Sequence, residues 1–267
     1  MKSLSSFFLH VIHRVTVRRS IVYGLVFNAL LMSSFSQAGV AMGLTRVIVT
    51  GDKNSGSVQI LNKGDQPALI QMWVDNKTAE MDQSPDKIKV PFVIETPVFR
   101  LNANTNQWVR IFYSGKAGHV LPDRESMFWL NVLEVPPKVE GDRGKQNKLQ
   151  IAFRSRLKLF YRPAGIPASA QGVEQKLAFQ LVPKGNSYVL RVTNPTPFHV
   201  TFLSLALGGE NSKPKEDIAL NVDAVVPPKE SVDIPLKNNE KLSGVNKTVF
   251  FSIIDDFGTT VEGQQAL

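Results

Sequence analysis

The sequence has 267 residues, of which 43% are hydrophobic, 20% charged and 9% aromatic, and its formal net charge is +8. These proportions are typical of a globular protein with a sizeable core, and they exclude disordered and collagen-like chains. The absence of cysteine excludes disulfide-stapled miniproteins, cysteine nucleophiles and thiolate metal sites.

The first 38 residues predict a secretory signal peptide. They carry four basic residues and no acidic one, and the apolar stretch Ile21–Phe35 is followed by the small-residue sequence Ser36–Ala38. Cleavage after Ala38 leaves 229 residues and lowers the formal net charge to +4. No later segment has the roughly 18 consecutive apolar residues of a membrane span, so we expect no membrane insertion after cleavage.

Residues 39–162 predict short strands separated by turn signals, and no helical periodicity competes with them. Their spacing is typical of one β-sandwich of about 100 residues. The expected strands are Arg46–Val49, Ser57–Leu61, Ala68–Val74, Phe92–Ile94, Gln107–Tyr113, Ser126–Val135 and Leu149–Tyr161.

The segment Pro163–Ala168 contains two prolines and a glycine and predicts a short linker. We therefore expect an all-β chain of two β-sandwich domains, residues 39–162 and 163–267. The second set of expected strands is Ala178–Val182, Tyr188–Val192, His199–Leu207, Val232–Leu236 and Val249–Ile254.

The strand expected at Leu149–Tyr161 has one apolar face, because Leu149, Ile151 and Phe153 alternate with polar or small residues. Apolar strand residues usually fill the core of their own domain. A side chain cannot face both that core and a partner, so the exposure of these three residues distinguishes the two interpretations. The preceding polar segment Lys138–Lys148 has little to bury, and we expect it to be mobile without a partner.

Five motifs occur in an order that closely resembles the periplasmic pilus-assembly chaperones. They are Asp123–Asn131, Val135–Pro137, Leu157–Pro163, Asn194–Phe198 and Asp255–Gly258. The resemblance spans essentially the whole chain after Ala38. It implies two immunoglobulin-like β-sandwich domains joined by a short linker, with no enzymatic activity and no metal or cofactor. It also implies a periplasmic chaperone that caps pilus subunits by donor-strand complementation and delivers them to an outer-membrane usher.

The resemblance assigns roles to two groups of residues. Leu149, Ile151 and Phe153 are the candidates for insertion into the groove of a subunit. Arg46 and Lys158 match the pair that binds a subunit's terminal carboxylate, which a guanidinium and an ammonium can share through charge-assisted hydrogen bonds. In a regular strand Lys158 lies on the face opposite Phe153, so we expect a bulge or a change of partner strand between them.

Glu125, Arg162 and Asp256 match an ionic cluster that links the two domains in this family. The alternative is three unrelated surface charges, and Asp255 competes with Asp256 for the third position. The eleven residues of the Lys138–Lys148 loop and the absence of cysteine indicate the short-loop group of the family.

Other functions find weaker support. After cleavage only His119 and His199 remain as histidines, and no hydrolase or nucleotide-binding motif occurs. The basic run Arg154, Arg156, Lys158 and Arg162 suggests a polyanion surface, but the net charge is modest and we expect no nucleic-acid partner. A secreted two-domain immunoglobulin-like adhesion or ligand-binding protein is the alternative class. The identity of the subunits, and whether idle copies cap each other as a dimer, stay open.

Overall fold

The computed structural model describes residues 39–76, 84–115, 120–137, 150–185, 187–209, 216–217, 224–236 and 247–267. The expected signal peptide, the loop Lys138–Lys148 and Leu149 lie outside the described residues. Within the described ranges the chain is nearly all β-structure, and none of its helical turns is long and apolar enough to span a bilayer.

The first nine strands form one sandwich. Their order across the sheet is β5-β7-β3-β2-β9-β8-β4-β6, and β1 pairs with β3. The strands are β1 (Val40–Met42), β2 (Arg46–Thr50), β3 (Ser55–Asn62), β4 (Ala68–Asp75), β5 (Phe92–Ile94), β6 (Val98–Leu101), β7 (Asn106–Tyr113), β8 (Ser126–Val135) and β9 (Phe153–Arg162), with a 3₁₀ turn at Pro85–Lys87.

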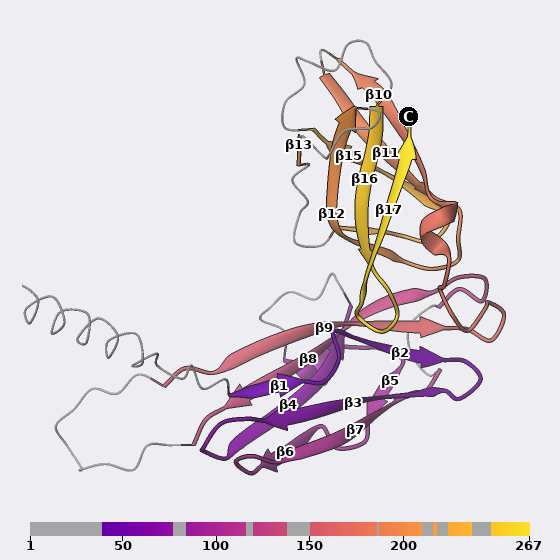
Figure 1. The fold of residues 1–267 in the computed structure, drawn as a ribbon. Coiled ribbons are helices and arrows are strands. Elements are labelled where there is room, and N and C mark those ends of the chain that lie inside the picture. The colour runs from indigo at the N-terminus through magenta and orange to yellow at the C-terminus, as the bar shows by residue number, and fades with distance from the viewer. Residues whose placement is uncertain are drawn as a thin grey trace, which may run out of the picture. The chain divides into compact units, whose positions relative to one another are not determined.

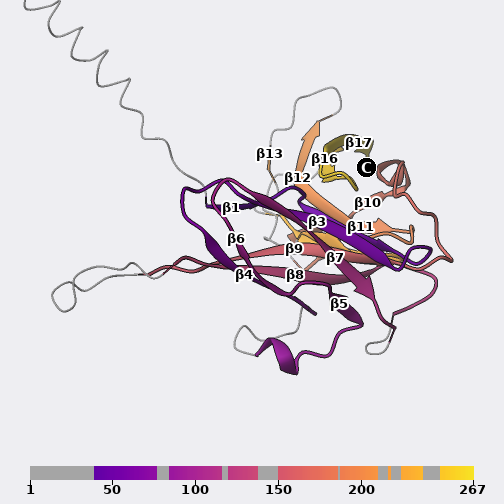
Figure 2. The same cartoon turned by 90° about the horizontal axis from the view of Figure 1, so that it is seen from below.

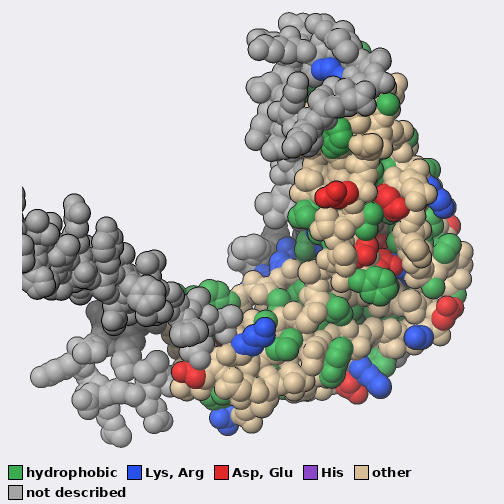
Figure 3. All heavy atoms as spheres, in the orientation of Figure 1, with side chains coloured by type: hydrophobic (Ala, Val, Ile, Leu, Met, Phe, Trp, Pro, Cys, Tyr) green, Lys and Arg blue, Asp and Glu red, His purple; other side chains and the backbone are tan. Residues whose placement is uncertain are grey.

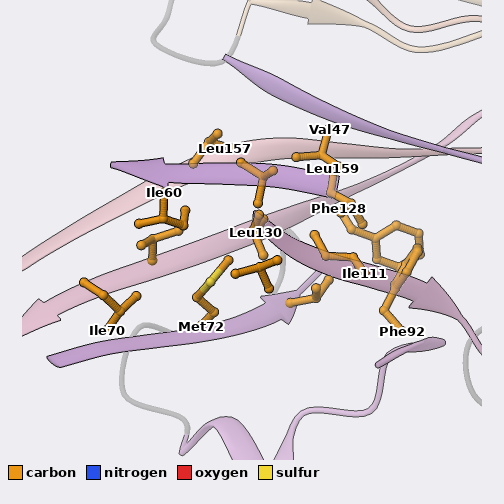
Figure 4. Close-up of a cluster of buried hydrophobic side chains, with 14 of the residues drawn as sticks. Val47, Ile60, Ile70, Met72, Phe92, Ile111, Phe128, Leu130, Leu157 and Leu159 are labelled. Carbon is orange, nitrogen blue, oxygen red and sulfur yellow. The ribbon is translucent and has the colours of Figure 1, made fainter. Parts of the chain in front are cut away.

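Strand β2 joins the two halves of this sandwich. It meets β3 at a single antiparallel position, Thr50 opposite Ser55, and runs parallel to β9 over five positions. Because side chains alternate along each strand, every strand turns one face inward. Figure 4 shows the resulting core, in which side chains such as Ile60, Ile111 and Leu130 are fully buried between the strands of both halves.

The second sandwich contains the remaining strands. One sheet has the order β10-β11-β15, and the other has the order β13-β12-β16-β17 with β14 paired to β12. Its core is built around Leu190, Leu205 and Val249. The strands are β10 (Ala178–Lys184), β11 (Ser187–Asn194), β12 (Val200–Gly209), β13 (Glu216–Asp217), β14 (Val225–Val226), β15 (Glu230–Pro235), β16 (Lys247–Ile254) and β17 (Thr260–Ala266), and a second 3₁₀ turn spans Val173–Lys176.

The fold confirms the expected all-β class with two immunoglobulin-like sandwiches. Several expected strand boundaries differ from the structure by one or two residues, and the largest difference is in the strand expected from Leu149, which begins at Phe153. Its partner β8 ends at Val135, and the two prolines that follow lack the N–H groups needed to continue the ladder. The sequence patterns also missed five strands, β1, β6, β13, β14 and β17.

Candidate functional site

The first site is formed by two cations, one at the start of β2 and one on the neighbouring strand β9. Arg46 and Lys158 are directly opposite each other in the parallel β2–β9 ladder. The Arg46 guanidinium lies 5.7 Å from the ring centroid of Phe160, and Lys158 Nζ lies 5.1 Å from the ring centroid of Trp129. The fold therefore places the two residues of the expected carboxylate site side by side on one face of the sheet.

Arg46 is more deeply buried than Lys158, with 7% of its surface exposed. Its Nη1 donates a hydrogen bond to the Ile254 carbonyl (3.0 Å), while Nε has no partner among the described residues. A cavity of about 390 Å³ borders its side chain. Burial lowers the pKa of Arg46, and the carboxylates of Asp256 and Glu125 act in the opposite direction. This guanidinium thus retains donor capacity beside a cavity.

The second site is the start of β9, where two apolar side chains lie outside the core. Ile151 is 52% exposed and Phe153 is 62% exposed. Neither belongs to the hydrophobic cluster that contains Leu157 and Leu159 of the same strand. Figure 3 shows that other hydrophobic side chains are dispersed over the visible surface. The third residue of the expected insertion set, Leu149, lies outside the described residues.

The same part of β9 has an open edge. Strand β8 pairs with β9 continuously from Phe153 to Tyr161. Strand β2 covers the opposite edge only from Lys158 onward, so the segment Phe153–Leu157 has no partner strand on that side within the described chain. Figure 1 shows β9 running past the start of β2, and Figure 2 shows β8 and β9 running together. The sequence predicted either a bulge or a change of partner strand between Phe153 and Lys158. The register between β8 and β9 is unbroken, so there is no bulge, and the partner on the other edge of β9 changes at Lys158.

The third site is an ionic cluster centred on Arg162, whose side chain is 4% exposed. Arg162 Nε donates to Glu125 Oε2 at 2.7 Å, and its two terminal nitrogens donate to Asp256 at 2.7 and 2.6 Å. Arg162 Nη1 also donates to the Ala168 carbonyl. Although burial opposes the charge, the bonds to Asp256 and Glu125 raise the pKa of Arg162 above its ordinary value.

The turn between β16 and β17 decides which aspartate joins this cluster. Asp255 Oδ1 accepts hydrogen bonds from the backbone N–H groups of Phe257 and Thr259, at 2.9 and 2.7 Å. Gly258 adopts a φ of +85°, which favours glycine. Asp255 therefore organises the turn, and Asp256 is the residue that faces Arg162.

Comparisons with known proteins bear on the function of this arrangement. The model of the pili and flagellar-assembly chaperone PapD N-terminal domain matches residues 39–167, and that of the pili assembly chaperone PapD C-terminal domain matches residues 172–265. The chain belongs to this chaperone family. It functions as a pilus-assembly chaperone, and its family membership indicates a periplasmic location.

Individual relatives of the chaperone agree with this assignment. This chain is 37% identical over 242 residues to the probable fimbrial chaperone YadV of Escherichia coli K12, covering 88% of this chain and 92% of the relative. It is 38% identical over 239 residues to chaperone protein FimB/FhaD of Bordetella pertussis, covering 87% and 89%. The crystal structure of YadV superposes with a TM-score of 0.68 at 34% identity, covering 86% of this chain and 100% of that one. These relatives do not favour the alternative of a secreted adhesion module.

Sequence patterns missed two features of the chaperone's site. His199 donates its backbone N–H to Glu125 Oε1, and its Nδ1 lies 3.0 Å from the same oxygen. On β4 and β8, Trp73 and Trp129 lie beneath arginines of β9. The tryptophans sit within predicted strands, but which cation stacks on each ring depends on the register between strands, and a single sequence does not contain that register.

Proposed function

We propose that this chaperone captures a pilus subunit by adding the open edge of β9 to the subunit's incomplete sheet. The observation that carries the proposal is that the exposed apolar side chains of Ile151 and Phe153 lie at the start of a strand edge that has no partner strand within the described residues. An open edge offers backbone N–H and C=O groups to a partner strand, and its alternate side chains fill pockets in the partner. A similar protein provides a precedent: the crystal structure of Salmonella enterica SafA pilin in complex with the SafB chaperone superposes with a TM-score of 0.67 at 27% identity, covering 86% of this chain and 96% of that one.

The position of β2 determines where the captured strand ends. A subunit strand that pairs with Phe153–Leu157 lies in line with β2, which occupies the next positions along the same edge. If the subunit strand runs parallel to β9, as β2 does, its carboxyl end meets Arg46 and Lys158. Two cations at this point provide charge-assisted hydrogen bonds for a terminal carboxylate. The proposed anchor thus follows from where the open edge stops.

Burial of the inserted side chains supplies much of the affinity. A fully buried Ile or Phe side chain contributes about 1.5–3 kcal/mol, so the two described residues contribute about 3–6 kcal/mol before ordering costs. Leu149, with the same spacing, is the proposed third insertion residue. Backbone hydrogen bonds and the carboxylate site add to this, and together they give an interaction strong enough to retain a subunit until it is passed on.

The remaining parts of the proposal concern the setting of this reaction. We propose that the chain is exported by residues 1–38 and cleaved after Ala38, that it acts without catalysis, and that an outer-membrane usher receives its subunits. The eleven-residue loop Lys138–Lys148 and the absence of cysteine favour the short-loop group. Within the described chain no cluster of three or more His, Cys, Asp or Glu side chains is arranged to hold a metal.

The proposal is tested by Ile151→Asp, compared with Gln150→Asp, in periplasmic co-expression with a subunit from the same gene cluster. The first change drives a carboxylate into an apolar groove, which costs several kcal/mol, so recovery of the chaperone–subunit complex should fall at least tenfold. Gln150 is exposed, and its side chain donates one hydrogen bond to the Pro136 carbonyl, so its replacement should have a much smaller effect. Equal recovery with both variants would show that this segment is not inserted.

A further inference from the structure

The outer face of β4, β8 and β9 carries a row of cations beside the open edge. This face is opposite the hydrophobic core, and cross-strand registers align its residues in three rows. The rows are Asp75, Trp129 and Lys158; Trp73, Asn131 and Arg156; and Gln71, Leu133 and Arg154.

The cations of this face lie flat against indole rings. The guanidinium of Arg154 lies 4.9 Å from the ring centroid of Trp73, and that of Arg156 lies 4.6 Å from the ring centroid of Trp129. Lys158 shares the ring of Trp129. A position over an aromatic face restrains a guanidinium, and its remaining N–H groups then suit a carboxylate. In Arg154, Nε and Nη2 already donate to Asn131 Oδ1 at 2.9 and 2.7 Å, so Nη1 is the nitrogen that remains for a partner. The arrangement is therefore ordered before any partner arrives.

One carboxylate of this face is paired with its two arginines. Asp75 is the sole acidic residue among the nine, and its side chain is 1% exposed. It accepts hydrogen bonds from Arg156 Nη2 at 2.8 Å and from Arg154 Nη2 at 3.2 Å. The arginine side chains keep 32% and 25% of their surfaces exposed. The face consequently presents an excess of two positive charges next to the segment Phe153–Leu157.

The spacing of the cations matches one face of a neighbouring strand. Successive residues on the same face of β9 are about 6.6 Å apart, and a strand paired in parallel presents its side chains at the same interval. This step rests on the proposed capture at β9. Arg46 already occupies the position beside Lys158, so the last residue of a captured strand lies beside Leu157. The residues one and three positions before it then lie beside Arg156 and Arg154 on the same face.

We propose that Arg154 and Arg156 are specificity-determining residues that recognise acidic side chains one and three positions before the last residue of the subunit chain. The apolar residues between those positions face the opposite side, together with Ile151 and Phe153. The chaperone then recognises both faces of a subunit's terminal strand. It buries the apolar side chains of one face and pairs its arginines with the acidic side chains of the other. Oppositely charged neighbours on paired strands stabilise the pair, whereas like charges destabilise it.

The experiment uses the mature chaperone and nine-residue synthetic peptides with alternating apolar residues and a free carboxyl end. Three peptides carry Glu, Gln or Lys at the positions one and three residues before the last residue. We expect the Glu peptide to bind about three- to tenfold more tightly than the Gln peptide, and the Lys peptide to bind most weakly, as measured by calorimetry. Arg156→Gln should reduce the preference for Glu. Arg110→Gln, an exposed arginine on β7, is the matched control and should preserve it.

The outcomes separate this inference from the function on which it rests. Equal binding of the Glu and Gln peptides, with binding lost when the carboxyl end is amidated, overturns the charge recognition and supports the anchor. Binding of none of the peptides overturns both. A preference for Glu that persists in Arg156→Gln overturns the assignment of this recognition to Arg156. If that variant does not fold, the wild-type peptide series still tests the recognition of acidic side chains. Tighter binding of a heparin oligosaccharide than of the Glu peptide assigns the face to polyanions and also overturns it.

Discussion

Arg162 holds carboxylates from two sandwiches at once, Glu125 from the turn before β8 and Asp256 from the turn after β16. Replacing a whole buried ionic cluster by apolar residues can leave the free energy of unfolding nearly unchanged. Removing a single partner is costly, because it leaves an uncompensated charge in a poorly hydrated site. The cluster therefore fixes how the turns meet more than it adds net stability.

The pKa of Asp256 makes this cluster sensitive to acid. Burial alone would raise that pKa, but the hydrogen bonds and charge of Arg162 hold it below the ordinary value of 3.8. A carboxyl group with a depressed pKa in the folded state stabilises the protein above its unfolded pKa, and that contribution disappears as the pH falls through the folded pKa. The stabilising contribution of Asp256 should thus be complete at pH 5 and above, and decline below about pH 4.

Asp256→Asn provides the test. At pH 7 the variant should lose about 3 kcal/mol of unfolding free energy, because the buried Arg162 loses one of its two charged partners. Melting temperatures of both proteins, measured between pH 7 and pH 3, should differ by several degrees at neutral pH and converge in acid. A difference that stays constant down to pH 3 would contradict the role of Asp256 ionisation.

At the scale of single residues, motifs located the ionic cluster in the sequence, since Glu125, Arg162 and Asp256 each sit in a recognisable segment. They did not reveal that His199 shares Glu125, nor that indole rings support the cations of β9. Those contacts depend on which residues of neighbouring strands are opposite each other. Alternation along one strand predicts a face, but it contains no information about the register to the next strand.

Among the elements, strands with strong alternation were predictable, whereas several short or polar strands at sheet edges were not. The missed strand β17 has the sequence Thr260–Ala266, which is polar and contains Gly263. Its glycine covers the ring of Phe251, where an added Cβ would lie 2.3 Å from the ring. A strand at the edge of a sheet that buries little has no apolar period to detect, although its backbone pairs over seven positions.

The change of partner along β9 predicts a step in amide exchange. In the free chaperone, amides of Phe153–Leu157 that point away from β8 should exchange rapidly with solvent, because no strand of the described part of the chain pairs with them. Capture of a subunit should slow their exchange by at least tenfold in hydrogen–deuterium exchange mass spectrometry. The segment Leu159–Tyr161, already paired on both sides, is the internal control. Equal protection of the two segments on binding would argue against pairing at the open edge.

On the scale of the whole complex, β2 would block the path of a strand captured as proposed. Addition of one residue to the carboxyl end of a subunit should therefore reduce complex formation at least tenfold, even though a carboxylate is still present. The extra residue either collides with β2 or shifts the strand by one position, which turns its apolar residues to the wrong face.

Pull-down of subunits extended by one residue at either end measures this effect, and the extension at the amino end is the control. Unchanged capture of the subunit extended at its carboxyl end would mean that the pockets alone set the register.

The abrupt end of the open edge at Lys158 also constrains when capture can happen. A strand within a longer polypeptide has to continue past this point, where Arg46–Thr50 already fills the space. In the proposed parallel register, only a chain whose final residue has already left the secretion channel can pair with Phe153–Leu157. The chaperone would then ignore polypeptides still in transit and accept completed ones, so that the order of export and assembly is enforced by the length of one strand.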